Sequence, residues 1–247
     1  MAPPRPALSR GGGDRYYGGR YHRGMKVELH SHTRHSRDCL LSYDGIIDVC
    51  RRRGIGALAV TDHNEIDGAF ELQRRAPFPV IVGEEIFSAQ GEIIGLFLKE
   101  FIPRDLSARE TVARIKGQGG LVYVPHPFDS YRKGAVGRET LDEIRADVDL
   151  LEVLNARNIR HEDDDRALRY AYEHGLVMAA GSDAHSLGEF GNAYLDMEPF
   201  DGPRDFLAKA RQGRIRGRHS TALVHLLSSY AKTHKRVAKR LGAVASA

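Results

Sequence analysis

The sequence contains few cysteines and no long hydrophobic run. Cys39 and Cys50 are the only thiols among 247 residues, which is too few for a disulfide framework and compatible with a reducing compartment. No run of about 18 apolar residues occurs, so we expect no membrane span. The first residues include Arg and Pro but no apolar stretch of the kind found in signal peptides. These absences exclude a disulfide-rich framework and favour a cytoplasmic location.

Positive charge is concentrated at the two ends of the chain. Residues 1–24 carry five arginines against one aspartate, and residues 231–247 carry five Lys and Arg without an acid. Because the whole chain has a net charge of +4, residues 25–230 are left with −5. An acidic body fits a pocket of carboxylates that bound cations neutralise. The basic ends could contact nucleic acid or could simply be solvated, and the sequence leaves both interpretations open.

Residues 1–24 combine Pro, Gly, Arg and Tyr without apolar periodicity, which predicts a disordered leader. From Met25 onward, strand and helix signals alternate. Ser42 and Ser107 are expected to cap helices, and Gly175 to end one. The expected strands are 26–30, 56–61, 79–85, 92–98, 121–125, 149–154 and 177–181, and the expected helices are 42–53, 65–75, 107–117, 162–174 and 203–212.

Repeated strand–helix units predict a mainly parallel sheet covered by helices. With about seven strands, we expect an α/β fold in which the sheet closes into a distorted (βα)7 barrel. This barrel would form a single domain over residues 25–218. Residues 219–247 would form a basic C-terminal helix or tail that lies on the barrel or extends from it.

Histidines and carboxylates recur just after the expected strands. In βα barrels the C-terminal ends of the strands carry the active site. His30 and His32 are two residues apart, so on a strand their side chains face the same way and can bind one cation. Thr61-Asp62-His63 follows the second strand, and Ser182-Asp183-Ala184-His185 follows the last. Together with Gly83-Glu84-Glu85, Glu92, Pro125-His126-Pro127 and Glu152-Val153-Leu154-Asn155, these segments indicate a hydrolytic metalloenzyme.

Five stretches resemble the PHP (polymerase and histidinol phosphatase) domain family: VELHSHTRHSRDCLLS, ALAVTDHNEIDGA, PVIVGEEIFSAQGEIIGLFL, GGLVYVPHPFD and AAGSDAH. They cover roughly residues 26–190 in the order typical of the family. Within it, the chain is most similar to the stand-alone metal-dependent phosphoesterases. The resemblance implies a seven-stranded barrel that holds two or three divalent metal ions. The mixture of His and carboxylates suits zinc, manganese or iron.

The resemblance also implies a ligand set. His30, His32, Glu85 and Asp183 would hold a first metal, and Glu85 would bridge to a second metal bound by His126. Asp38, His63 and His185 would hold a third. Many members have His where this chain has Glu92, which would give the second metal a carboxylate ligand.

Two points about this ligand set stay open in the sequence. Glu84 competes with Glu85 for the bridging position. Asp62 could orient ligands instead of binding metal. His161 lies near the expected mouth and could contact substrate, whereas His225 is expected to face solvent.

A phosphate group needs cations besides metals. Arg157 follows the sixth expected strand and is the first candidate, because a guanidinium can grip phosphate oxygens in a bidentate manner. Arg34, Arg132 and Lys133 are further candidates for substrate binding. With Asp183 or a metal-bound water as proton donor, we expect Arg157 and Asp183 to take part in catalysis.

These residues predict a metal-dependent phosphoric ester hydrolase acting on a phosphomonoester of a small metabolite or nucleotide. Alternatives are a histidinol-phosphate phosphatase and a nuclease that acts on nucleotide or RNA ends, with nucleic acid bound through the basic tails. A non-catalytic binding domain would have lost ligands, and this chain retains nearly all of them. We expect no cofactor other than metal and no membrane partner, and the sequence does not determine an oligomeric state.

Overall fold

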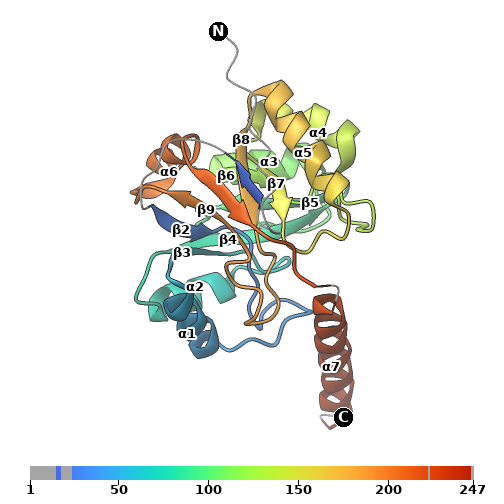
Figure 1. Ribbon diagram of the computed structural model, residues 1–247. Helices are drawn as coiled ribbons and strands as arrows, with labels where there is room; N and C mark the ends of the chain where they lie inside the picture. The colour runs from blue at the N-terminus through green and yellow to red at the C-terminus, as the bar shows by residue number, and fades with distance from the viewer. Residues whose placement is uncertain (1–14, 18–23, 222, 246–247) are drawn as a thin grey trace.

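The computed structural model describes residues 15–17, 24–221 and 223–245. Strands and helices alternate over most of this length, as Figure 1 shows. The strands are β1 (Arg15–Tyr17), β2 (Met25–Glu28), β3 (Ile55–Val60), β4 (Val80–Ser88), β5 (Gly91–Leu96), β6 (Leu121–Val124), β7 (Leu150–Asn155), β8 (Val177–Gly181), β9 (Ala193–Met197) and β10 (Arg214–Gly217). The helices are α1 (Tyr43–Arg53), α2 (Asp67–Arg75), α3 (Ala108–Gly117), α4 (Gly137–Ile144), α5 (His161–His174), α6 (Gly202–Ala210) and α7 (Val224–Ala245), with a 3-10 turn at Arg145–Asp147.

Three helix ends lie where the sequence predicts a cap. Ser42 Oγ accepts a hydrogen bond from the Gly45 N–H at the start of α1. Ser107 Oγ accepts one from the Glu110 N–H at the start of α3. Gly175 takes the left-handed conformation, with φ of 64°, at the end of α5. These caps satisfy backbone groups that a helix end would otherwise leave without partners.

The strands form one sheet in the order β1-β10-β9-β2-β3-β4-β5-β6-β7-β8. The segments that follow β2 and β8 also meet, through a parallel bridge between Ser31 and Ala184. The His32 N–H donates to the Ala184 carbonyl at 3.0 Å, and the Ala184 N–H donates to the His30 carbonyl at 3.3 Å. The sheet is therefore a nearly closed, distorted barrel, which confirms the predicted fold class. We call the junction between these two segments the seam.

The sheet is mixed rather than mainly parallel. β5 runs antiparallel to both β4 and β6, because the short turn after Ser88 returns the chain directly beside β4. β9 and β10 were not expected from the sequence and pair antiparallel on the far side of β2. Helix α4 was also missed. In Figure 1, α1 and α2 lie together on one side of the barrel and α3, α4 and α5 on another.

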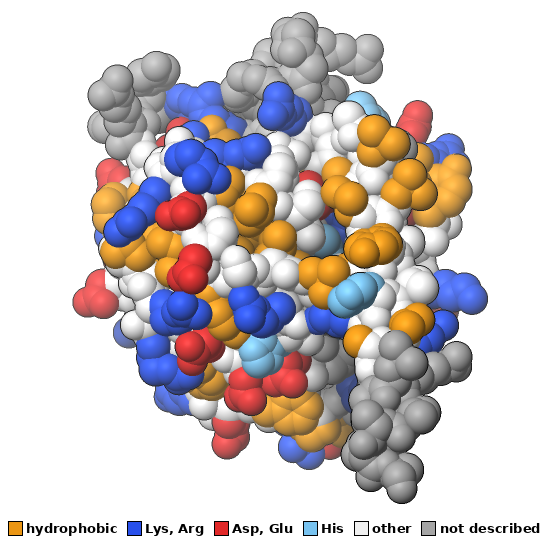
Figure 2. Space-filling model, turned by 90° about the horizontal axis from the view of Figure 1, so that it is seen from below, with side chains coloured by type: hydrophobic (Ala, Val, Ile, Leu, Met, Phe, Trp, Pro, Cys, Tyr) orange, Lys and Arg blue, Asp and Glu red, His pale blue; other side chains and the backbone are white. Residues whose placement is uncertain are grey.

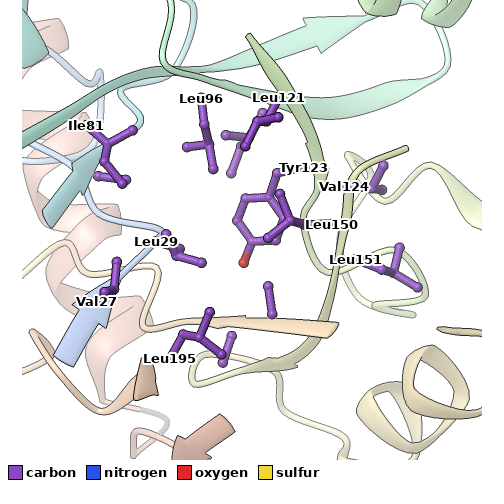
Figure 3. Close-up of a cluster of buried hydrophobic side chains, with 14 of the residues drawn as sticks. Val27, Leu29, Ile81, Leu96, Leu121, Tyr123, Val124, Leu150, Leu151 and Leu195 are labelled. Atoms are coloured by element: carbon purple, nitrogen blue, oxygen red, sulfur yellow. The ribbon is translucent and has the colours of Figure 1, made fainter. Parts of the chain in front are cut away.

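The interior of the barrel is filled by apolar side chains from strands across the sheet. Figure 3 shows Val27 of β2, Ile81 of β4, Leu96 of β5 and Leu195 of β9 around the ring of Tyr123. All five side chains are buried. The inward-facing residues thus make a packed core beneath the end of the barrel at which the strands deliver their polar residues.

The two ends of the chain differ in how far the structure describes them. Most of the predicted leader, residues 1–14 and 18–23, lies outside the described residues, while Arg15–Tyr17 pairs with β10 as strand β1. The basic C-terminal segment contains α7, which projects from the body in Figure 1. Of the helices described here, none has the length and hydropathy that crossing a membrane requires.

Candidate metal centre

The nine residues predicted as metal ligands come together at one end of the barrel. All but Asp38 and His63 are buried, and these two are partly buried. His30 and His32 follow β2, Asp38 lies in the next loop, His63 follows β3, Glu85 and Glu92 lie in β4 and β5, His126 follows β6, and Asp183 and His185 follow β8.

The first group consists of four side-chain atoms that surround one point. His30 Nε2 lies 3.4 Å from Glu85 Oε2 and 3.7 Å from Asp183 Oδ1. His32 Nε2 lies 3.5 Å and 3.2 Å from the same two oxygens. In a tetrahedral site with bonds of about 2.1 Å, ligand atoms are about 3.4 Å apart. The separations therefore fit a single divalent cation held by these four residues.

The same four atoms lack hydrogen-bond partners. His30 Nε2, His32 Nε2, Glu85 Oε2 and Asp183 Oδ1 are all buried, and none makes a hydrogen bond in the described structure. Leaving a buried polar atom without a partner costs about 1–3 kcal/mol. Four such atoms directed at one point are explained by a cation that they would share, and the donor set fits that cation.

The second group forms around the other oxygen of Glu85. Glu85 Oε1 lies 3.1 Å from His126 Nε2, and Glu92 Oε2 lies 3.9 Å from the same nitrogen. Glu92 sits near the start of its strand, but β5 is antiparallel to β4, so its first residues lie at the edge where β4 carries Glu85. The two oxygens of Glu85 thus face two different ligand groups, as a bridging carboxylate would.

Asp38, His63 and His185 form a third group. His185 Nε2 lies 3.2 Å from Asp38 Oδ1, and His63 Nε2 lies 3.6 Å from Asp38 Oδ2. His63 also reaches both other groups, because its Nδ1 lies 2.9 Å from Glu85 Oε2 of the first and 3.8 Å from Glu92 Oε1 of the second. The ring of His32 stacks on His63 with centroids 4.5 Å apart. The three groups are therefore contiguous, and their members can serve neighbouring cations.

Burial and neighbouring charges shift the pKa values of the ligands in different directions. Although burial opposes it, nearby carboxylates raise the pKa of His30 well above its usual value and that of His63 to about 9, so both would release a proton on metal binding. Burial alone would raise the pKa of Glu85, but the surrounding histidines outweigh it and hold that pKa well below the usual value. The pKa of Asp183 is lowered in the same way, chiefly by Arg132. The pKa of His32 is lowered by burial and by the nearby imidazoles. Ionised carboxylates and a neutral imidazole are the forms that bind metal.

Glu152 of β7 orients two of the ligand residues through hydrogen bonds to groups other than their metal-directed atoms. Its Oε1 accepts hydrogen bonds from His30 Nδ1 at 3.1 Å and from the Tyr123 hydroxyl at 2.6 Å. Its Oε2 accepts from the His126 backbone N–H at 2.7 Å and from Asn155 Nδ2 at 2.8 Å. A proton on His30 Nδ1 leaves the lone pair on Nε2, which is the atom directed at the first group.

Asp62 organises the loop that carries His32. It accepts hydrogen bonds from the backbone and hydroxyl groups of Thr33 and Ser36. Ser36 Oγ in turn lies 3.0 Å from His32 Nδ1. Since the Ser36 hydroxyl proton goes to Asp62, its oxygen accepts the His32 Nδ1 proton and leaves Nε2 free. Asp62 therefore has the orienting position, which settles the alternative that the sequence left open.

Glu84 does not share the site with Glu85. Neighbouring residues on a strand point to opposite faces, and Glu84 Oε2 accepts a hydrogen bond from the Ile102 N–H at 3.0 Å. Its burial raises its pKa to about 8. Glu85 is therefore the residue of this pair that lies in the candidate centre.

The three predicted arginines differ in their placement. Arg132 pairs with Asp129 at 3.0 Å and with Asp183 Oδ2, so it lies beside the first group. Arg34 is exposed, its guanidinium lies over the ring of Tyr43, and it does not line the cavity above the centre. Its role in substrate binding stays a prediction.

Arg157 lines the cavity, and the nitrogens of its guanidinium lie against protein groups. Nε pairs with Glu189 at 3.2 Å, Nη1 lies 2.6 Å from His185 Nδ1, and Nη2 donates to the Val224 carbonyl and to Ser228 Oγ at 3.1 and 2.7 Å. These contacts occupy the edges of the guanidinium that would grip a phosphate, and the catalytic role of Arg157 stays a prediction. The guanidinium connects the centre to α7.

A cavity of about 510 Å³ opens above the three ligand groups. Asp38, His63, Glu92 and His185 line its floor. Its walls include Lys133 and residues that sequence reasoning did not select, namely Arg37, Asp129, His225, Ser228 and Lys232. The last three come from α7, about 40 residues beyond the final ligand motif, and no local pattern in the sequence connects them to the site. His161 does not line this cavity; its ring stacks on His219.

The barrel and its ligand groups define a protein with a candidate centre for divalent cations. A family model described as PHP-associated matches residues 161–215. The uncharacterized protein MJ0417 of Methanocaldococcus jannaschii is 38% identical over 194 residues, which cover 74% of this chain and 78% of that protein. MJ1587 of the same organism is 41% identical over 145 residues, which cover 53% of this chain and 82% of that protein.

One solved structure with the same fold is a two-domain protein from Bacteroides vulgatus that contains a predicted PHP-like metal-dependent phosphoesterase. It superposes with a TM-score of 0.64 at 18% sequence identity and covers 86% of this chain and 68% of that one. The chain belongs to the PHP domain family, as its sequence motifs predicted.

Proposed function

We propose that the protein is a metal-dependent phosphoesterase that hydrolyses a phosphomonoester of a small metabolite or nucleotide. The observation that carries the proposal is Glu85, whose two oxygens face two adjacent ligand groups. Metal pairs that share a ligand are typical of hydrolytic phosphate chemistry. The similarity to a predicted PHP-like phosphoesterase supports the same activity.

Divalent cations bound in these groups would supply a nucleophilic hydroxide at neutral pH and would offset charge on the phosphate. The residues of the chain would bind these cations and surround the substrate. His30, His32, Glu85 and Asp183 would hold the first cation, with His30 fixed by Glu152. Zinc, manganese and iron all suit this donor set.

The cationic residues of the cavity would bind the phosphate oxygens that the metals do not reach. Arg132 already pairs with the outer oxygen of Asp183, and Arg37 and Lys133 line the same cavity. Asp183 is unsuited to donating a proton to the leaving group, because its lowered pKa keeps it ionised. We therefore propose Asp183 as a ligand and not as the acid. The cytoplasm is the proposed setting, since both buried cysteines are free thiols.

The test is phosphate release from a panel of phosphomonoesters, with manganese or zinc added and with a chelated control. His126→Ala and Asp183→Ala should each lower turnover by at least about a hundredfold while the fold is kept. His174→Ala is the matched control, because His174 ends α5 and lies outside the centre. If no ester releases phosphate with any metal, or if both site variants keep normal turnover, the proposal is wrong.

A further inference from the structure

Helix α7 faces the body with a mixed face of small apolar and polar residues, while its large apolar side chains are exposed. Val224, Ser228, Ala231 and Lys235 are buried or partly buried and recur at spacings that place them on one face of the helix. The large apolar side chains are exposed instead, with Leu226 at 66%, Leu227 at 53%, Tyr230 at 65% and Val237 at 48%. Figure 2 looks onto the end of the molecule from which α7 projects, and hydrophobic side chains are exposed there.

A surface helix of a globular protein ordinarily buries its apolar stripe against the core. Because α7 leaves its large apolar side chains exposed and buries only small ones such as Ala231, burial of apolar surface alone does not explain where it sits. Its position is also fixed by polar contacts with the body. These contacts lie next to the candidate metal centre.

Two contacts hold α7 in place. Near its start, Arg157 donates to the Val224 carbonyl and to Ser228 Oγ, and the same guanidinium pairs with buried Glu189. Further along, Lys235 Nζ donates to the carbonyl oxygens of Arg34 and Ser36, in the loop between His32 and Asp38. The helix is thus attached to two segments that position ligands of the centre.

Lys232 lies between these two contacts, four residues after Ser228 and three before Lys235, and it lines the cavity above the metals. Arg37 and Lys133 approach the same cavity from other loops. Within the described residues, no carboxylate forms a salt bridge with any of these three cations. Carboxylates that hold metals are not available to neutralise them, so the cavity offers positive charge to an incoming anion.

We propose that α7 is part of the substrate site, with Lys232 binding anionic oxygens of the phosphoester that the metals leave free. Arg157 is then a positioning residue that fixes α7 over the cavity. This inference rests on the proposed function, since it assigns the anion to a substrate of the same centre. It also gives the basic C-terminal segment a role at the metal centre.

The first test measures anion binding without catalysis. Inorganic phosphate is titrated into the manganese-loaded protein by calorimetry, and metal content is measured for every variant. Lys232→Gln should weaken phosphate binding about tenfold, the worth of one charge-assisted hydrogen bond, and Lys232→Arg should restore most of it. Arg236→Gln removes the same charge from the same helix at an exposed position that does not line the cavity, and it should change nothing.

Kinetics provide the second readout. Lys232→Gln should raise KM for the preferred phosphomonoester about tenfold and change kcat far less, because the lost contact binds ground state and transition state alike. Equal behaviour of Lys232→Gln and Arg236→Gln in both assays would refute the inference. A wild-type protein without phosphatase activity would refute the proposed function alone, since the phosphate titration would still decide the role of Lys232.

The positioning role of Arg157 is tested by combining variants. Arg157→Gln should weaken phosphate binding and increase hydrogen exchange in α7 at unchanged metal content. In the Lys232→Gln background it should cause no further loss of phosphate affinity, because both changes remove the same contact. Fully additive losses would show that Arg157 does not act through Lys232.

Discussion

Replacing Glu152 with glutamine tests whether this buried carboxylate tunes the candidate centre. Its two oxygens accept four hydrogen bonds, two on each oxygen, from His30, Tyr123, the His126 backbone and Asn155. Glutamine keeps one oxygen and replaces the other with an amide nitrogen. Whichever of the two positions the amide nitrogen takes, the two groups that donated to the carboxylate oxygen there now face another donor.

Either orientation weakens the first ligand group. With the nitrogen toward His30, the imidazole must move its proton to Nε2 and lose the lone pair that is directed at the cation. With the nitrogen on the other side, the His126 N–H and the Asn155 amide lose their acceptor. Removing such an outer partner typically lowers metal affinity by about 10- to 100-fold, which corresponds to about 1.4–2.8 kcal/mol.

Competition with a chelator measures metal affinity without any substrate and therefore tests this prediction directly. Asp149→Asn is the matched control, because this carboxylate bonds Lys116 and the Val122 N–H just before β7, at the end of the strand away from the centre. It should leave metal affinity unchanged. Wild-type affinity in Glu152→Gln would show that the charge of Glu152 does not act on the centre.

Three further predictions concern the whole molecule. Removing bound metal with a chelator should lower the melting temperature by about 5–10 °C, since a ligand at a hundred times its Kd stabilises the fold by about 2.7 kcal/mol. Calorimetry that shows no shift would contradict cation binding. Gly181→Ala should lower the free energy of unfolding by about 1–3 kcal/mol and weaken metal binding, because a Cβ there would lie 2.4 Å from both His30 Cβ and Glu152 Oε1. Chemical denaturation measures the first effect and the chelator assay the second. Burial raises the pKa of Cys39 and of Cys50 from 9.0 to about 12, so a thiol reagent at pH 8 should label both only after unfolding, and rapid labelling of the folded protein would contradict their burial.

The sequence predicted the barrel and most of the ligands because both depend on local signals. Strand β8 was predicted at its observed bounds, and the caps at Ser42 and Gly175 follow from short-range hydrogen bonds. His30 and His32 were expected on one face, and their Nε2 atoms do reach the same two oxygens. A ligand that stands at the end of a strand can be predicted from the strand alone.

What the sequence did not predict depends on contacts between distant segments. Glu92 was predicted as a ligand from the family resemblance and not from its place on a strand, because it reaches the centre through the reversal of β5 beside β4, a pairing that hydrophobic periodicity does not encode. Strands β9 and β10 are short, and their patterns are weak. The face of α7 that carries Ser228 and Lys235 would ordinarily be assigned to solvent, so the contact of Arg157 with Ser228 could not be foreseen. A helix that leaves its large apolar side chains exposed needs polar partners that only the folded chain supplies.

The seam of the barrel has a consequence for how the protein matures. The first ligand group takes His30 and His32 from the segment after β2 and Asp183 from the segment after β8, and these segments form the seam. During synthesis, the group stays incomplete until Asp183 has left the ribosome and β8 has reached β2. A cation bound there would join early and late parts of the chain, so metal uptake would follow barrel closure and report it. Truncation before β8 would therefore abolish high-affinity loading even with His30, His32 and Glu85 all present.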